Sequence, residues 1–204
     1  DVQALGDAAR GEMIYRRKAI SCTQCHAIGP AGPLIGPNLV AAGAAAKPGY
    51  IVESILEPNK AIAEHYENRL FLLDDGTTQT GIVTFKSEKE VIVRDATLAG
   101  KEVRLPVEEI VAEKTLQSAM PAGLVDQLGG RQEFLDLAKF VSVLGKPGSY
   151  ANVESPVIRK WRVVGMPAGD EFPADDAEWM TVYSKVSGEL PWDDLPVGRR
   201  VFAQ

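Results

Sequence analysis

The sequence is poor in the residues that most often bind metals or form cross-links. Only two cysteines and two histidines occur among 204 residues. Both cysteines lie in one short motif, so none is left over for a separate structural disulfide. No apolar run approaches the roughly 20 residues needed to span a bilayer, which predicts a chain without a transmembrane segment. Basic residues are also in the minority, since 22 lysines and arginines face 28 aspartates and glutamates, and this balance argues against nucleic-acid binding.

The two cysteines stand at Cys22 and Cys25, and His26 follows at once. This C-x-x-C-H spacing is the signature of covalent c-type haem attachment. Two thiols three positions apart can add to the two vinyl groups on one edge of a haem, and the adjacent imidazole can then reach the iron. The motif therefore predicts one haem c, covalently bound through Cys22 and Cys25, with His26 as an axial ligand of the iron.

Three other interpretations of the motif are open. A C-x-x-C redox pair is expected near a βαβ pattern, and none surrounds this one. A zinc site would have to recruit His65 at an unusual spacing, and the neighbouring Cys25 and His26 would chelate one tetrahedral ion poorly. A disulfide across two intervening residues would be strained. Haem is the favoured interpretation.

Hydrophobic spacing predicts a first helix over Asp7–Arg17. Its apolar positions, Ala9, Met13 and Ile14, recur at helical spacing and define a buried face. Gly11 lies in the middle of this helix, where glycine costs roughly 1 kcal/mol of helix propensity. A glycine at that position is expected if another helix crosses closely.

Two further helices are expected, over Pro48–Leu56 and Arg131–Leu144. Pro48 suits a first helical turn, and the last helix carries an i, i+3, i+4, i+7 apolar stripe. Between them, from Asn68 to Leu116, the pattern changes to the period of strands. This region predicts a small antiparallel sheet of four or five strands, which begins with a hairpin around Asp74-Asp75-Gly76.

The segment Gly145–Ser149 is rich in turn-forming residues and indicates a boundary. We therefore expect one domain over residues 1–146, with the β region at about 68–116. Residues 147–204 are expected to be an irregular C-terminal extension, or the start of another module, with one strand at Trp161–Gly165. The predicted fold class is mainly helical with an inserted sheet, and α+β overall.

Gly36-Pro37-Asn38-Leu39 resembles the loop of class I c-type cytochromes that lies behind the proximal histidine. In that family the proline carbonyl accepts a hydrogen bond from the histidine Nδ1–H, which fixes the imidazole tautomer and makes it a stronger donor to iron. The resemblance implies that Pro37 has this role for His26. Residues 1–67 and 116–146 carry the match to the cytochrome c fold.

The second axial ligand has several candidates. Met120 lies in the loop Ser118–Leu124, just before the last predicted helix, where class I cytochromes place their ligand methionine. The resemblance therefore implies a low-spin haem ligated by histidine and methionine. The other candidates are His65, Met13, Met166, Met180 and an open site.

His26 and Met120 are 94 positions apart (120 − 26), which is longer than in small class I cytochromes, and the predicted sheet accounts for the excess. Cytochromes with such an insertion resemble the haem-binding domains of large exported planctomycete and verrucomicrobial proteins. The resemblance implies electron transport to or from a redox protein partner, such as a dehydrogenase or terminal oxidase, rather than catalysis by this chain. The alternative is a haem sensor or enzyme with an open or labile distal site.

The expected location is the periplasm, or otherwise outside the cytoplasm, because c-type haem is attached beyond the cytoplasmic membrane. Asp1–Gly6 shows neither the basic nor the apolar region of a signal peptide. The sequence is therefore interpreted as that of a mature or trimmed exported protein.

Overall fold

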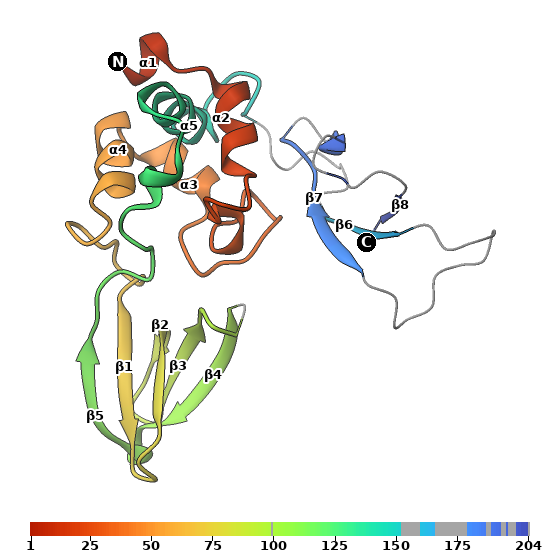
Figure 1. Cartoon of the computed structure of the whole chain (residues 1–204). Helices are drawn as coiled ribbons and strands as arrows, with labels where there is room; N and C mark the ends of the chain where they lie inside the picture. Colours follow the sequence, from red (N-terminus) through yellow and green to blue (C-terminus); the bar gives the residue numbers. More distant parts are fainter. Residues whose placement is uncertain are drawn as a thin grey trace.

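The computed structural model describes residues 1–98, 100–151, 160–165, 179–186, 189–192, 195 and 199–203. These residues form helices, a five-stranded antiparallel sheet and a three-stranded one (Figure 1), which confirms the predicted α+β class. The helices gather at one end of the molecule and the five-stranded sheet forms the opposite end. Within the described part of the chain, no helix combines the length and the apolar character needed to cross a bilayer.

The helical end is organised around α5 (Arg131–Val143). This helix packs against α1 (Val2–Leu5), α2 (Ala8–Tyr15), α3 (Leu39–Ala45) and α4 (Pro48–Leu56). Helix α4 has its predicted bounds and α5 ends one residue early. Helix α2 is shorter than predicted: it begins after Asp7, which caps its first turn by accepting a hydrogen bond from the Arg10 main-chain N–H, and it ends at Tyr15. Helices α1 and α3 were not expected from the sequence.

Gly11 lies where α2 crosses α5. A Cβ at this position would lie 2.0 Å from the main-chain oxygen of Asp136 and 2.7 Å from the Cβ of Phe140. No side chain larger than that of glycine fits between the two helices without moving one of them. The prediction that Gly11 marks a close helix crossing is confirmed.

The buried face of α2 differs from the predicted one. Met13 and Ala9 are exposed, with 54% of Met13 accessible to solvent, so the expectation that Met13 belongs to the core was wrong. The buried residues are Gly11, Glu12, Ile14 and Tyr15. Because Gly11 must face α5, the residues three and four positions later are turned inward with it, and Met13 is turned away.

The inserted sheet contains β1 (Asn68–Leu73), β2 (Thr78–Lys86), β3 (Glu90–Asp95), β4 (Lys101–Pro106) and β5 (Ile110–Thr115). The strand order is β4-β3-β2-β1-β5, with every neighbouring pair antiparallel. The antiparallel sheet predicted for this region is confirmed. It has a small core of its own, formed by Phe71, Val91, Val93 and Leu105.

Residues after α5 form more regular structure than the predicted irregular extension. Strands β6 (Lys160–Gly165), β7 (Met180–Tyr183) and β8 (Arg199–Ala203) pair in the order β7-β6-β8. Only the first was expected, because the other two are short and lie among proline and acidic residues. Just after α5, the Tyr150 ring packs edge-on against Phe140, with centroids 5.6 Å apart. The domain limits of 146 and 147 stay a prediction.

Candidate cofactor site

The C-x-x-C-H motif, residues 22–26, folds into one tight turn, named here the attachment turn after the role that the sequence predicts for it. Cys22–Gln24 form a single 3₁₀ turn, and the main-chain N–H groups of Cys25 and His26 both donate to the carbonyl of Cys22, at 3.2 and 3.0 Å. Ser21 enters the turn with φ of 58°, a left-handed conformation that is uncommon for residues other than glycine. The turn brings the two thiols and the imidazole to the wall of one cavity.

The His26 imidazole is held by the chain on one of its two nitrogens. Its Nδ1 lies 2.8 Å from the carbonyl oxygen of Pro37. A carbonyl can only accept, so Nδ1 carries the proton and Nε2 keeps a free lone pair. Burial lowers the pKa of His26, although the hydrogen bond to Pro37 opposes this shift. The result is a neutral, oriented imidazole, which is the form that binds metals.

The loop behind His26 is locked by Asn38. The Asn38 side chain accepts hydrogen bonds from the main-chain N–H groups of Gly29 and Val40, and donates to the carbonyl of Gly29 at 2.6 Å. It thereby closes the loop and caps α3 at once. Because Pro37 immediately precedes Asn38, the same contacts fix the carbonyl that holds His26.

Gly36 leaves room for the imidazole ring. A Cβ on Gly36 would lie 2.4 Å from Cε1 and 2.7 Å from Nδ1 of His26. The ring therefore lies directly against the main chain, and a side chain at this position would occupy its place. Gly36 is also tied to the attachment turn, since its N–H donates to the carbonyl of Cys25 at 2.8 Å.

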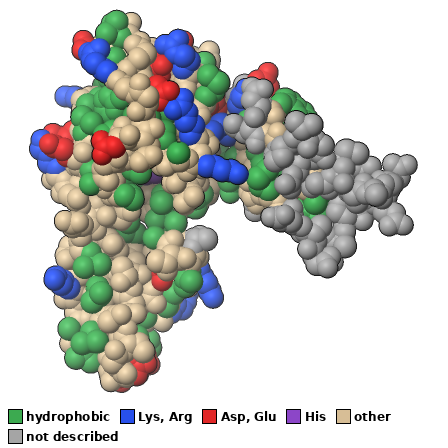
Figure 2. All heavy atoms as spheres, in the orientation of Figure 1, with side chains coloured by type: hydrophobic (Ala, Val, Ile, Leu, Met, Phe, Trp, Pro, Cys, Tyr) green, Lys and Arg blue, Asp and Glu red, His purple; other side chains and the backbone are tan. Residues whose placement is uncertain are grey.

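The cavity has a volume of about 760 Å³ and largely apolar walls. This size lies within the range of cofactor sites in proteins, roughly 300–1,000 Å³. Its walls come from the attachment turn, the loop at 35–39, helices α3, α4 and α5, and the segments 58–66 and 118–125. Figure 2 shows hydrophobic side chains on the surface where the helices meet the five-stranded sheet.

The five-stranded sheet contributes to the same cavity. Ile82 of β2 lines it and is almost fully buried. Nearby, the Arg94 guanidinium donates to the carbonyl of Leu34, which joins β3 to the loop that follows the attachment turn. The sheet therefore closes part of the site.

Met120 lines the cavity from the loop between β5 and α5. Its main-chain N–H donates to Ser118 Oγ at 3.1 Å, and the N–H of Ser118 donates to Asn59 Oδ1 at 2.8 Å. These contacts fix the loop against the segment that follows α4. The side chain of Met120 is thus brought to the same cavity as His26.

The other candidate ligands lie elsewhere. The side chain of His65 is 79% exposed, beside Glu64, and it does not line the cavity. Met13 is exposed on α2 and Met180 lies in β7; neither lines the cavity. Met166 lies outside the described residues. Of the candidates that the structure describes, Met120 alone lines the same cavity as the attachment turn.

Both thiols are partly buried, and this burial affects their pKa. Burial raises the pKa of Cys22 to about 11 and also raises the pKa of Cys25. Reactive redox cysteines have a lowered thiol pKa, so this environment does not favour a redox pair. Both cysteines are free thiols, and within the described residues no group of three or more His, Cys, Asp and Glu side chains is placed to hold a metal ion.

The residues present fit a haem held by thioether bonds. The thiols, the oriented imidazole and the methionine all face one apolar cavity, and Gly36 leaves the ring its space. Reasoning from the sequence missed the roles of Gly36, Asn38 and Ile82. An asparagine before an Ala-rich run is a helix-capping signal, whereas nothing local in the sequence marks Ile82.

No protein-family model matches this chain, and no curated protein matches it significantly.

Proposed function

We propose that this chain is a single-haem c-type cytochrome that transfers electrons to or from a redox protein. Cys22 and Cys25 hold the haem covalently, and His26 and Met120 are the axial ligands of its iron. The observation that supports this most strongly is the single largely apolar cavity lined by all four side chains. The contact between His26 Nδ1 and the Pro37 carbonyl adds support, because it leaves Nε2 available to iron.

A haem bound here supplies one-electron chemistry through the ferrous and ferric states of its iron. The side chains of the protein orient the group and control its surroundings. Pro37 fixes the tautomer of His26, and Gly36 fixes the place of the imidazole ring. Ile82 and the other apolar side chains of the cavity walls exclude water, and the polarity around a metal site tunes its potential.

The proposed ligand set favours electron transfer over catalysis. With both axial positions taken by side chains, no coordination position is left for a substrate, and the electron passes to a partner without bond formation. A haem sensor or enzyme would require Met120 to leave the iron. Methionine ligation also favours a higher potential than ligation by two histidines.

In this proposal the helices form a class I cytochrome c fold over residues 1–146, with the sheet at 68–116 as an insertion and 147–204 as an extension. The insertion is what relates the chain to the planctomycete and verrucomicrobial haem-binding domains. The partner is a dehydrogenase or a terminal oxidase in the periplasm or another compartment outside the cytoplasm. The net charge of −6 suits a basic docking patch on that partner.

The test is expression in a host that carries the machinery for covalent haem attachment. We expect a red protein with a Soret band, and haem that stays with the polypeptide on a denaturing gel. The control is the double variant Cys22→Ser, Cys25→Ser, which should lose the gel-bound haem. A colourless wild-type protein would show that this chain does not bind haem.

Carbon monoxide separates a carrier from a sensor. The reduced wild-type protein should bind carbon monoxide slowly or not at all, because Met120 occupies the position that the gas needs. The Met120→Ala variant should bind it at once. Rapid binding by the wild-type protein would favour the sensor over the carrier.

A further inference from the structure

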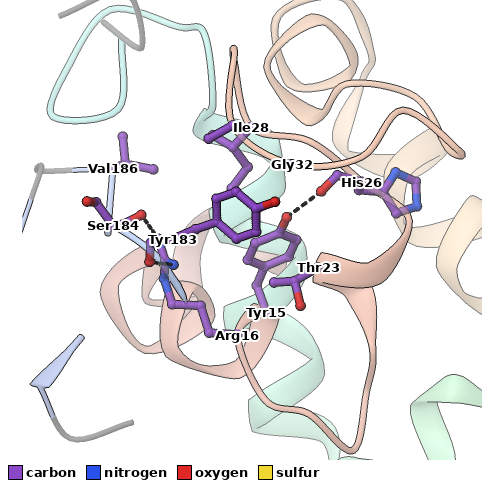
Figure 3. Close-up of a pocket in the computed structure, with 10 residues that line it drawn as sticks. Tyr15, Arg16, Thr23, His26, Ile28, Gly32, Tyr183, Ser184 and Val186 are labelled. Carbon is purple, nitrogen blue, oxygen red and sulfur yellow. Dashed lines mark hydrogen bonds between the residues drawn. The ribbon is translucent and has the colours of Figure 1, made fainter. Parts of the chain in front are cut away.

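A short segment from the C-terminal part of the chain is built into the helical core. Residues Tyr183–Val186, named here the strap, begin at the last residue of strand β7 and lie against the end of helix α2 (Figure 3). Val186 is buried and belongs to the same apolar cluster as Tyr15 and Phe140. The strap is therefore part of the domain that forms the cofactor site, although it follows the end of α5 by about 40 residues.

Two charged side chains, Glu12 of α2 and Arg16 at its C-terminal cap, hold the strap by its main chain. Glu12 and Arg16 form an ion pair at 3.0 Å, and each side chain is only 8% exposed. The Glu12 carboxylate accepts a hydrogen bond from the Val186 N–H at 2.7 Å. Arg16 donates to the carbonyls of residues 183 and 184, the first at 2.7 Å.

These contacts explain how a charged pair is tolerated in a buried position. Buried charges are expensive unless further hydrogen bonds satisfy them, and here the strap supplies those bonds. Without it, Glu12 and Arg16 would keep only each other among the partners described. The end of α2 thus offers an acceptor, Glu12, and a donor, Arg16, for the main chain of one extended segment.

The strap lies beside the attachment turn, since residues of both line one small space that is separate from the cofactor cavity. Between Tyr183, Ser184 and Val186 of the strap and Tyr15, Thr23 and His26 lies a small, partly open space of about 20 Å³. In Figure 3, Tyr15 points toward His26, and its hydroxyl donates to the His26 carbonyl at 2.7 Å.

This space is large enough for a single water, which needs about 10–15 Å³. It is also polar enough, because the hydroxyls of Tyr15 and Thr23 belong to residues that line it. Arg16 lines it too, and Arg16 Nε is the buried side-chain atom without a hydrogen-bond partner within the described residues. One water held there would accept the hydrogen bond that Arg16 Nε can donate.

We propose that the strap is a proximal cover, which admits one water and keeps bulk solvent away from the back of the His26 turn. This role rests on the proposed function only in that the turn carries a haem. Solvent access around a metal ligand sets the local dielectric and hence the potential. Water stabilises the extra charge of ferric iron, so opening the cover lowers the reduction potential.

The test is hydrogen–deuterium exchange and potentiometry on the full-length holoprotein. Val186→Asp places a carboxylate in the apolar cluster and should release the strap. We expect the main-chain amides of residue 186 and of residues 23–32 to exchange about tenfold faster or more, while the amides of α5 exchange as in the wild type. We also expect the reduction potential of the haem to fall. The control is Thr181→Ala, an exposed position on β7, which should change none of these.

A second variant guards against collapse of the core. Glu12→Ala with Arg16→Ala removes both charges together, so that no lone charge stays buried, and should have the same effects. A released strap with unchanged exchange at 23–32 and an unchanged potential would overturn the cover. If the strap amides stay protected from exchange in both variants, then Glu12, Arg16 and Val186 are not what holds the strap in place. If the chain carried no haem, the proposed function would be wrong. The cover could still be tested, because hydrogen exchange at residues 23–32 does not need the haem.

Discussion

The imidazole of His26 occupies the space that a side chain on residue 36 would need. Since a Cβ on Gly36 would lie 2.4 Å from Cε1 of His26, Gly36→Ala must displace the ring from the Pro37 carbonyl. We expect a loss of about 1–3 kcal/mol in the free energy of unfolding, as for other overpacked sites, and a lower yield of attached haem. Urea denaturation and the ratio of Soret to protein absorbance measure the two effects.

Gly49→Ala is the matched control. Gly49 lies inside α4, and a Cβ there would meet nothing within 4 Å. Alanine is the better helix former, so this variant should be more stable by roughly 0.5–1 kcal/mol and bind haem normally. If Gly36→Ala behaved like Gly49→Ala, the close packing of ring and main chain would not limit the site.

Met120→Ala should remove the second axial ligand. We expect the long-wavelength methionine-to-iron charge-transfer band of the oxidised protein to disappear and the reduction potential to fall, because thioether ligation favours ferrous iron. Met13→Ala changes the same residue type at an exposed position and should leave the band in place. A band that survived in Met120→Ala would show that another group is the ligand.

Ile82→Ala tests whether the five-stranded sheet supports the site. Ile82 is buried and lines the cavity, so its truncation should cost about 2–5 kcal/mol and shift the Soret maximum as water reaches the haem. The control is Val111→Ala, on the exposed face of β5. Equal Soret spectra for the two variants would indicate that the sheet does not shield the haem from water.

Asp136→Asn should weaken the joint between α2 and α5. The Asp136 carboxylate is buried and accepts hydrogen bonds from the Asp7 N–H at 2.7 Å and from the Arg10 Nε at 2.8 Å. The amide can replace only part of these bonds and carries no charge. We expect a loss of about 1–3 kcal/mol at pH 7, measured by urea denaturation.

The same variant should remove part of the acid sensitivity of the fold. The hydrogen bond from Arg10 holds the pKa of Asp136 below its usual range, against the effect of burial. A carboxyl with a lower pKa in the folded state stabilises fully above its unfolded pKa of about 3.9, and this stabilisation is lost as pH falls through the folded pKa. The difference between wild type and Asp136→Asn should therefore shrink below about pH 4. A constant difference down to pH 2 would contradict this.

The parts of the structure that follow local patterns were predictable from the sequence. Pro48 and Pro58 delimit α4, the Asp-Gly turn begins the hairpin, and the period of two identifies the sheet. The proximity of Met120 to the attachment turn came from resemblance to a family, since no local pattern connects residues 94 positions apart.

The parts that depend on tertiary contacts were not predictable. The buried face of α2 is set by the crossing at Gly11, so the apolar Met13 is exposed while the charged Glu12 is buried. Apart from the buried Val186, the strap is bound through its main-chain carbonyls, which every residue has, and an N–H, which every residue except proline has. No side-chain pattern distinguishes such a segment from a linker.

The chain passes from the helical part into the five-stranded sheet, and back again, at two residues that lie next to each other. The N–H of Leu116, just after β5, donates to the carbonyl of Asn68, the first residue of β1, at 2.8 Å. A segment whose two ends are neighbours can be lengthened or shortened without moving the residues on either side of it, provided that it keeps the contacts of Ile82 and Arg94 with the site. The length of chain between His26 and Met120 is therefore free to vary widely among proteins that keep both side chains in place, and a grafted binding module could be inserted at the same junction.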